Sequence, residues 1–143
     1  QQALCSPERS LDNLAGYTFA YCRALEEGDV TQAREFLERR LALRKRMSVA
    51  QRRWLALEAA FFEARYHQNA QAARVWLALA KNSGKGRCAR FRAEAAILLA
   101  EGDKEGACIC IEKGLHAAEE ILFLGAGLLE KRWLQDLAEI ASV

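Results

Sequence analysis

Two histidines and five cysteines are the side chains of this sequence best suited to bind a metal or act as nucleophiles. His67 and His116 do not form an HExxH pair, and no CxxC pair or companion histidine at zinc-finger spacing is present. We therefore predict no metal site and no cofactor. An odd number of cysteines without a pairing pattern predicts that most are small buried side chains in a reducing compartment, the cytoplasm. The cysteines are Cys5, Cys22, Cys88, Cys108 and Cys110.

Motifs for phosphate binding and for hydrolysis are also missing. The Ser-Gly-Lys-Gly stretch at 83–86 is too short for a P-loop and predicts a turn between helices. No GxSxG sequence occurs. Adjacent carboxylates at 26–27 and 119–120 lie at the ends of predicted helices, where charged side chains are usually solvated. We predict that the chain is not an enzyme.

The composition favours helix throughout. Apolar residues make up 52% of the 143 residues, as in a soluble globular protein, and Pro7 is the single proline. The sequence predicts one all-α domain over residues 1–143. The longest apolar run, 121–129, contains two glycines and is too short for a transmembrane helix. Without a signal peptide or an initiator Met, we expect a processed form or a piece of a longer protein.

Three helix–turn–helix segments repeat along the chain. Each turn has a candidate N-cap, at Asp29, Asn69 and Asp103, with an alanine four residues later. Gly28 and Gly102 stand where the preceding helices should end. Asp29 with Gln32, and Ser48 with Gln51, have the spacing of capping boxes. The first two caps are 40 residues apart and the next two are 34 apart, which predicts an insertion at 41–48.

Bulky residues recur at fixed distances from these caps, as interlocking helix pairs require. The aligned columns are Tyr17, Leu57 and Phe91, then Ala24, Ala64 and Leu98, then Leu37, Leu77 and Ile111. The pattern resembles the tetratricopeptide repeat (TPR), best in the third unit, with Phe91, Ala95, Leu98, Gly102, Asp103, Ala107, Ile111, Gly114 and Leu115. The first two units depart from this pattern, because Tyr21, Phe61 and Arg40 stand where the family has small residues. The proline that usually ends a TPR unit is also absent. Other helix-pair solenoids remain an alternative.

The resemblance implies a right-handed α-α superhelix of about three helix pairs, over 10–47, 48–83 and 86–119. A further helix at about 127–142 carries Leu129, Trp133, Leu137 and Ile140 at helical spacing. A repeat array needs its terminal apolar face covered, so we expect this helix to cap the array. The alternative is that it forms an interface with a partner.

Charge is segregated along the sequence. Residues 39–93 contain 14 basic side chains against two acidic ones, a net charge of +12, whereas the flanking parts carry −4 and −6. Such a middle region predicts a positive surface that faces an anionic partner. An alternative is that the acidic ends dock onto it. The candidate basic patch is Arg44, Lys45, Arg46, Arg52, Arg53, Arg87 and Arg90.

The TPR resemblance also implies that the first helices of successive units line a concave groove. Carried over to this sequence, the main groove positions are Glu58, Phe62, Arg65, Tyr66 and Arg92, with Thr18, Cys22, Glu26 and Leu99 beside them. Phe62 has an alternative place in the core, because at least one of two adjacent rings must be buried. The lysine–asparagine clamp of some chaperone-binding TPR proteins is not matched at these positions.

The sequence therefore favours a non-catalytic interaction or scaffold module that binds a protein or peptide of acidic character in its groove. One alternative is binding of nucleic acid or another polyanion by the basic region 39–93. Another alternative rests on a loose resemblance of 59–79 and 90–107 to the helical tails that follow bacterial membrane metalloproteases. The chain would then be a repeat domain of a larger protein, and no activity is implied.

Overall fold

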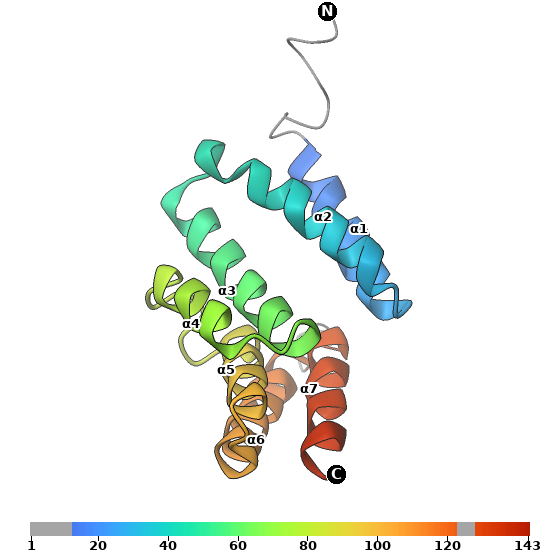
Figure 1. Ribbon diagram of the computed structural model, residues 1–143, viewed down its shortest axis with the longest axis vertical. Coiled ribbons are helices and arrows are strands. Elements are labelled where there is room, and N and C mark those ends of the chain that lie inside the picture. Colours follow the sequence, from blue (N-terminus) through green and yellow to red (C-terminus); the bar gives the residue numbers. More distant parts are fainter. Residues whose placement is uncertain (1–12, 123–127) are drawn as a thin grey trace, which may run out of the picture. The chain divides into compact units, whose positions relative to one another are not determined.

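The computed structural model describes the backbone of residues 13–122 and 128–143, and the side chains of 13–119 and 131–143. These ranges contain helices and no strand, so the all-α prediction is confirmed (Figure 1). The α-helices are α1 (Leu14–Glu26), α2 (Val30–Ala42), α3 (Val49–Tyr66), α4 (Ala70–Leu79), α5 (Cys88–Ala100), α6 (Lys104–Leu122) and α7 (Leu128–Ala141). A 3-10 helix, η3 (Arg44–Arg46), precedes α3. Cys5 and the start of the first expected repeat lie outside the described residues.

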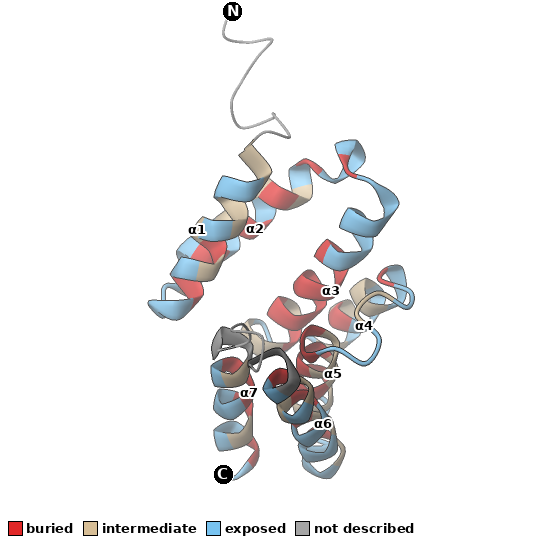
Figure 2. Ribbon diagram, turned by 180° about the vertical axis from the view of Figure 1, so that it is seen from behind, coloured by how far each residue is buried: buried red, intermediate tan, exposed pale blue. Residues whose placement is uncertain are grey.

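The chain forms two compact units, Gln1–Leu55 and Ala56–Val143, whose boundary falls within α3. The first unit contains α1, α2 and η3, and the second contains α4 to α7. The first turns of α3, residues 49–54, are exposed, whereas residues 55–62 are all buried (Figure 2). One helix therefore contributes a solvated end to the first unit and a fully enclosed segment to the second.

The predicted turns owe their geometry to local hydrogen bonds. The carboxylate of Asp29 accepts from the backbone N–H of Gln32, Asn69 accepts from Ala72 and Asp103 accepts from Gly106, at 2.9–3.0 Å. Each bond satisfies a donor that the first turn of a helix would leave unpaired. The backbone N–H of Asp29 bonds to the carbonyl of Ala24 at 2.9 Å, so this turn has the N-cap without the reciprocal half of a capping box.

The ends of the preceding helices follow the glycine prediction. Gly28 and Gly102 have φ of +76° and +86°, the left-handed conformation that closes a helix at low cost when no Cβ is present. The second turn has Gln68 at the same place, with φ of +51°. This left-handed conformation is strained for a residue with a side chain. Gly28 and Gly102 adopt it in the other two turns without that strain, so glycine at position 68 could make the same turn.

The insertion predicted at 41–48 is the 3-10 helix η3. Leu43 and Met47 flank it, and both side chains are buried. Ser48 and Gln51 then form the predicted capping box, with reciprocal bonds of 2.9 and 3.1 Å. The turn is therefore fixed at both ends by side chains, and the three basic residues between Leu43 and Met47 are exposed.

In the first unit, α1 and α2 pack against each other as a helix pair. Tyr21 and Ala24 of α1 and Ala33 and Leu37 of α2 are buried between them. The rings of Tyr17 and Phe36 lie 6.2 Å apart and the guanidinium of Arg39 lies over both, at 5.9 and 5.3 Å. Arg40, which departs from the TPR pattern, is buried with its guanidinium 5.2 Å from the ring of Tyr21. The two departures therefore pack against each other.

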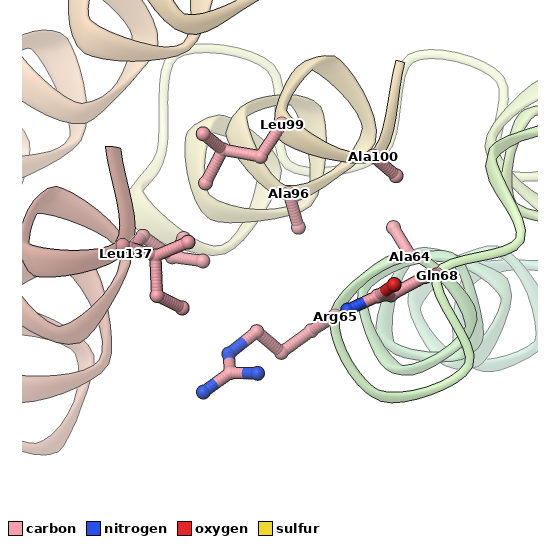
Figure 3. Close-up of a pocket in the computed structure, with 8 residues that line it drawn as sticks. Ala64, Arg65, Gln68, Ala96, Leu99, Ala100 and Leu137 are labelled. Carbon is pink, nitrogen blue, oxygen red and sulfur yellow. The ribbon is translucent and has the colours of Figure 1, made fainter. Parts of the chain in front are cut away.

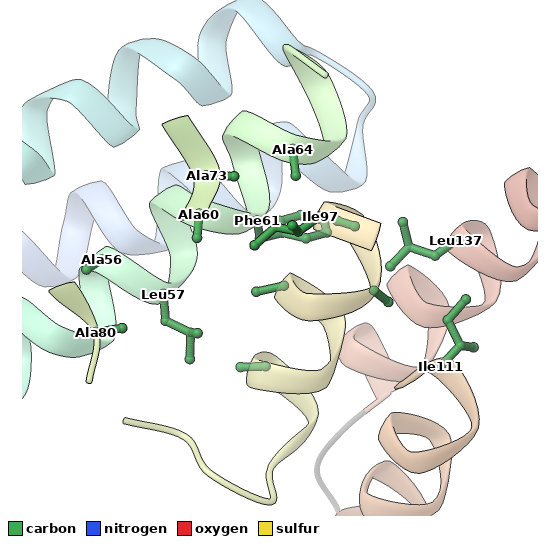
Figure 4. Close-up of a cluster of buried hydrophobic side chains, with 14 residues drawn as sticks. Ala56, Leu57, Ala60, Phe61, Ala64, Ala73, Ala80, Ile97, Ile111 and Leu137 are labelled. Carbon is green, nitrogen blue, oxygen red and sulfur yellow. The ribbon is translucent and has the colours of Figure 1, made fainter. Parts of the chain in front are cut away.

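The core of the second unit is built mainly from alanines around a few large side chains (Figure 4). Phe61 of α3, Ile97 of α5, Ile111 of α6 and Leu137 of α7 provide the bulk. Alanines such as Ala60, Ala64, Ala73, Ala80, Ala93 and Ala96 fill the remaining positions. Small side chains allow helix axes to approach closely, so this core depends on good fit more than on large buried area.

Helix α7 packs on α5 and α6 and covers apolar surface there. Its bounds agree with the predicted helix at about 127–142. Trp133, Leu134 and Leu137 are buried, whereas Ile140 is 39% exposed. At the contact with α6, a Cβ on Gly114 would lie 2.9 Å from a methyl of Leu134 and 3.1 Å from the Cβ of Phe91. A Cβ at this crossing would crowd Leu134 and Phe91, so the close approach favours glycine here.

The cysteine prediction is partly wrong. Cys88 is buried, but Cys22 and Cys110 are partly exposed and Cys108 is exposed. The error arises because burial on an amphipathic helix depends on which face the neighbouring helices cover, and no local pattern around a cysteine records that face.

Candidate functional site

An open groove of about 430 Å³ lies in the second unit between α3, α5 and α7 (Figure 3). Its floor is made of small and aliphatic side chains, and Arg65 and Gln68 supply its polar groups. In Figure 3, Arg65 extends from α3 across the mouth towards the helix that carries Leu137. The lining residues are Ala64, Arg65, Gln68, Ala96, Leu99, Ala100, Leu137 and Ile140. A groove of this kind can hold apolar side chains beside one anionic group.

Arg65 is held at the groove by the ring of Tyr66. Its guanidinium carbon lies 4.9 Å from the centre of that ring, within the range of a cation–π contact. Tyr66 in turn packs edge-on to Phe61 at 6.1 Å and tilted to Phe62 at 5.0 Å. The aromatic cluster therefore restricts the direction of Arg65 without neutralising its charge.

A second guanidinium lies in the same aromatic cluster. Arg92 of α5 is 4% exposed, and its guanidinium carbon lies 4.2 Å from the ring centres of both Phe61 and Trp133. Its Nε and Nη1 atoms are buried and have no hydrogen-bond partner. An arginine enclosed by two rings joins α3, α5 and α7, and its charge is balanced by ring quadrupoles and not by a buried carboxylate.

The hydroxyl of Tyr66 is influenced by both arginines. Burial raises the pKa of Tyr66 above its ordinary value, the charges of Arg65 and Arg92 oppose that rise, and Asp136 adds to it. The tyrosine therefore stays neutral at physiological pH and can donate a hydrogen bond. Arg65 and Arg92 therefore place two positive charges near this hydroxyl, with Asp136 as a negative charge nearby.

The structure brings together some of the predicted groove residues and encloses others. Arg65 and Leu99 line the groove and are partly exposed, and Tyr66 is partly exposed beside Arg65 but is not among the lining residues. Glu58, Phe62 and Arg92 are buried, with exposures of 8%, 1% and 4%, so their side chains offer little surface to a guest. Phe62 therefore lies in the core, the second of the two places that the sequence allowed for it.

Several lining residues were absent from the sequence prediction. Ala96 and Ala100 are one helical turn apart on α5, and small residues at that spacing could have indicated a close approach. Leu137 and Ile140 were predicted to lie on the helix that caps the repeat array, and not in the groove. Leu137 serves both purposes, since it belongs to the core and also lines the groove.

Several basic residues of the second unit make internal contacts. In the second unit, Arg90 donates to the carbonyls of Lys81 and Ser83 at 2.8 and 3.0 Å and pairs with Glu94 at 3.3 Å. Arg74 forms a two-pronged ion pair with Glu101, at 2.5 and 2.7 Å. With Arg92 buried, much of the positive charge of 65–93 is committed to internal contacts.

Of the predicted basic patch, Arg87 and Arg90 belong to the second unit, and Arg87 is exposed there. Arg44, Lys45, Arg46, Arg52 and Arg53 are exposed and all belong to the first unit. The structure thus assigns the two ends of the predicted patch to different units.

Among the described side chains, no group of three histidines, cysteines or acids is arranged to hold a metal ion. His67 lies 3.1 Å from Glu63 on the exposed side of α3. Across the described ranges, every helix is too short or too polar for a transmembrane span.

No protein-family model, curated protein or solved structure matches this chain.

Proposed function

We propose that this chain is a non-catalytic interaction module of TPR-like helix pairs, which binds an acidic peptide or helix in the groove between α3, α5 and α7. The observation that carries the proposal is the groove itself, an open apolar channel with the charged Arg65 across its mouth. Apolar surface supplies affinity on burial, and a positioned arginine selects for a carboxylate.

The order of the helices supports the TPR-like reading. In that arrangement α1–α2, α3–α4 and α5–α6 are successive pairs and α7 is the capping helix. The groove is lined by α3, α5 and α7, the helices at first-of-pair positions, which would face a concave surface. The three capped turns, with a fully buried alanine four residues after each cap (Ala33, Ala73 and Ala107), are consistent with one repeating plan.

The charges around the groove favour an acidic guest. Arg65 is partly exposed and bound to an aromatic ring, so a guest carboxylate could reach it without displacing an internal ion pair. The buried charge of Arg92 adds to the positive potential near Tyr66, the ring that Arg65 contacts. Asp136, next to the lining residue Leu137 in α7, would disfavour a guest with several acids in one cluster. A single acidic residue between apolar ones fits best.

The test is selection from a displayed library of random 12-residue peptides, with affinities of enriched peptides measured by calorimetry. We expect apolar residues at helical spacing around one Asp or Glu. Arg65→Glu should weaken binding at least about tenfold, since a charge-assisted hydrogen bond contributes about 1.5–3 kcal/mol. Ala100→Phe should also abolish binding by filling the floor.

Lys85→Glu is the matched control, because it makes the same charge change at an exposed position outside the groove lining. Circular dichroism must show that all three variants remain helical. Failure to enrich any peptide, or equal weakening by Arg65→Glu and Lys85→Glu, would contradict the proposed site.

A further inference from the structure

The groove between α3, α5 and α7 has the size and lining to hold one short apolar chain. Its volume of about 430 Å³ is that of a small-molecule site, commonly about 300–1,000 Å³. Six of the eight described lining residues are alanines or larger aliphatic residues, and Arg65 and Gln68 are the other two. An extended peptide backbone inside this groove would leave amide groups without hydrogen-bond partners, whereas an alkyl chain has none to satisfy.

A cage of aromatic rings lies one helical turn from the groove, towards the N-terminal ends of the same three helices. Each member of the cage stands four residues before a lining residue, and residues four apart share one face of a helix. The pairs are Phe61 and Arg65 in α3, Arg92 and Ala96 in α5, and Trp133 and Leu137 in α7. The guanidinium of Arg92 lies 4.2 Å from both ring centres and fills the cage. This filled layer limits how far a chain in the groove can extend along the helices.

Arg65 is the residue of the groove that suits an anionic group. Its guanidinium is held against the ring of Tyr66 at 4.9 Å, and the buried charge of Arg92 also acts on the hydroxyl of Tyr66. The groove lies at the C-terminal ends of α3, α5 and α7, where the helix dipoles place partial negative charge. Asp136 of α7 adds a further negative charge near Tyr66. The lining therefore favours a ligand with one anionic group, placed at Arg65.

We propose that the groove binds a free medium-chain monocarboxylic acid, with the carboxylate on Arg65 and the alkyl chain against Leu99, Leu137 and Ile140. A guanidinium and a carboxylate form a charge-assisted hydrogen bond, and each methylene buried in the groove raises the affinity about fourfold. The inference rests on the proposed function in that both ligands use the same groove. The acid and a bound peptide should therefore compete.

The first test is calorimetry of the 143-residue chain with hexanoate and octanoate, below the concentrations at which they form micelles. Affinity should rise about fourfold for each added methylene. Arg65→Gln should weaken octanoate binding about tenfold or more and leave the binding of octanol unchanged, because the alcohol makes no charge-assisted hydrogen bond. Lys85→Gln, at an exposed position outside the lining, is the matched control and should change neither.

Methyl NMR spectra test where the acid binds. Octanoate should shift the methyl signals of Leu99, Leu137 and Ile140, which line the groove. Val75 and Leu79 on α4 are 60% and 54% exposed but lie outside the lining, so their signals report non-specific binding to apolar surface and should not move.

Three results would overturn the proposal. The first is binding of octyltrimethylammonium as tight as that of octanoate, and the second is equal weakening by Arg65→Gln and Lys85→Gln. The third is a shift of the Val75 and Leu79 signals as large as that of the lining residues.

The peptide selected for the proposed function separates the two hypotheses. Octanoate binding at the lining residues, with no peptide enriched, would support the carboxylic acid and contradict the peptide. A peptide that binds the groove while octanoate neither binds nor displaces it would overturn the carboxylic acid alone.

Discussion

Replacement of Arg92 tests how the second unit tolerates a buried, unpaired guanidinium. Two cation–π contacts at 4.2 Å stabilise it, by about 0.5–2 kcal/mol each. Against this, each of the two buried nitrogens without a partner, Nε and Nη1, costs about 1–3 kcal/mol. The two contributions are similar in size and opposite in sign, so the charge itself should contribute little to the free energy of unfolding.

Arg92→Met keeps most of the side-chain volume between the rings of Phe61 and Trp133 and removes the unpaired donors. We expect the free energy of unfolding to change by less than about 1.5 kcal/mol, as when buried ionic groups are replaced by apolar ones. Arg92→Ala removes the filling between the rings and should cost about 2–5 kcal/mol through the cavity it leaves. The difference between the two variants isolates packing from charge.

Urea unfolding of both variants, followed by circular dichroism and tryptophan fluorescence, measures these changes. Equal slopes with denaturant would show that the variants unfold the same surface. A loss above about 3 kcal/mol in Arg92→Met would refute the reasoning, because it would mean that the guanidinium makes a polar contact the apolar side chain cannot replace. Equal stability of the Met and Ala variants would refute the packing role.

Three further predictions concern stability. Gly114→Ala should lower the free energy of unfolding by about 1–3 kcal/mol, because the added Cβ would overpack the crossing of α6, α5 and α7. Gly16→Ala on α1 has open space around it and should raise the free energy of unfolding by up to about 1 kcal/mol. Thermal unfolding compares the two variants. Gln68→Gly should raise the free energy of unfolding by about 1 kcal/mol by relieving a positive φ, and no change in urea unfolding would contradict the strain. The hydrogen bond from Arg74 lowers the pKa of Glu101, so this pair stabilises the fold above the ordinary pKa of a glutamate and loses its effect as pH falls through the lowered pKa. Glu101→Gln should therefore cost up to about 1 kcal/mol at pH 7 and almost nothing at pH 2, and an equal cost at both would show that the ion pair is not responsible.

Local sequence determined the turns of this protein. Asp29, Asn69 and Asp103 cap their helices, and Ser48 with Gln51 forms a capping box, because each bond joins groups three residues apart. The same holds for the left-handed conformations at Gly28 and Gly102. Interactions of this range depend little on the rest of the fold, so residue type and spacing were enough to predict them.

Only the tertiary structure decided which charged and aromatic residues are accessible to a partner and which are enclosed in the core. Arg65 and Arg92 looked equivalent in the sequence, yet one reaches the groove and the other is enclosed between the rings of Phe61 and Trp133. Phe62 was open to either place, and the structure buries it. Burial is set by helices that are distant in the sequence, and Trp133 is 41 residues from Arg92. Helical periodicity fixes which side chains share a face, but only packing between helices determines which face is covered.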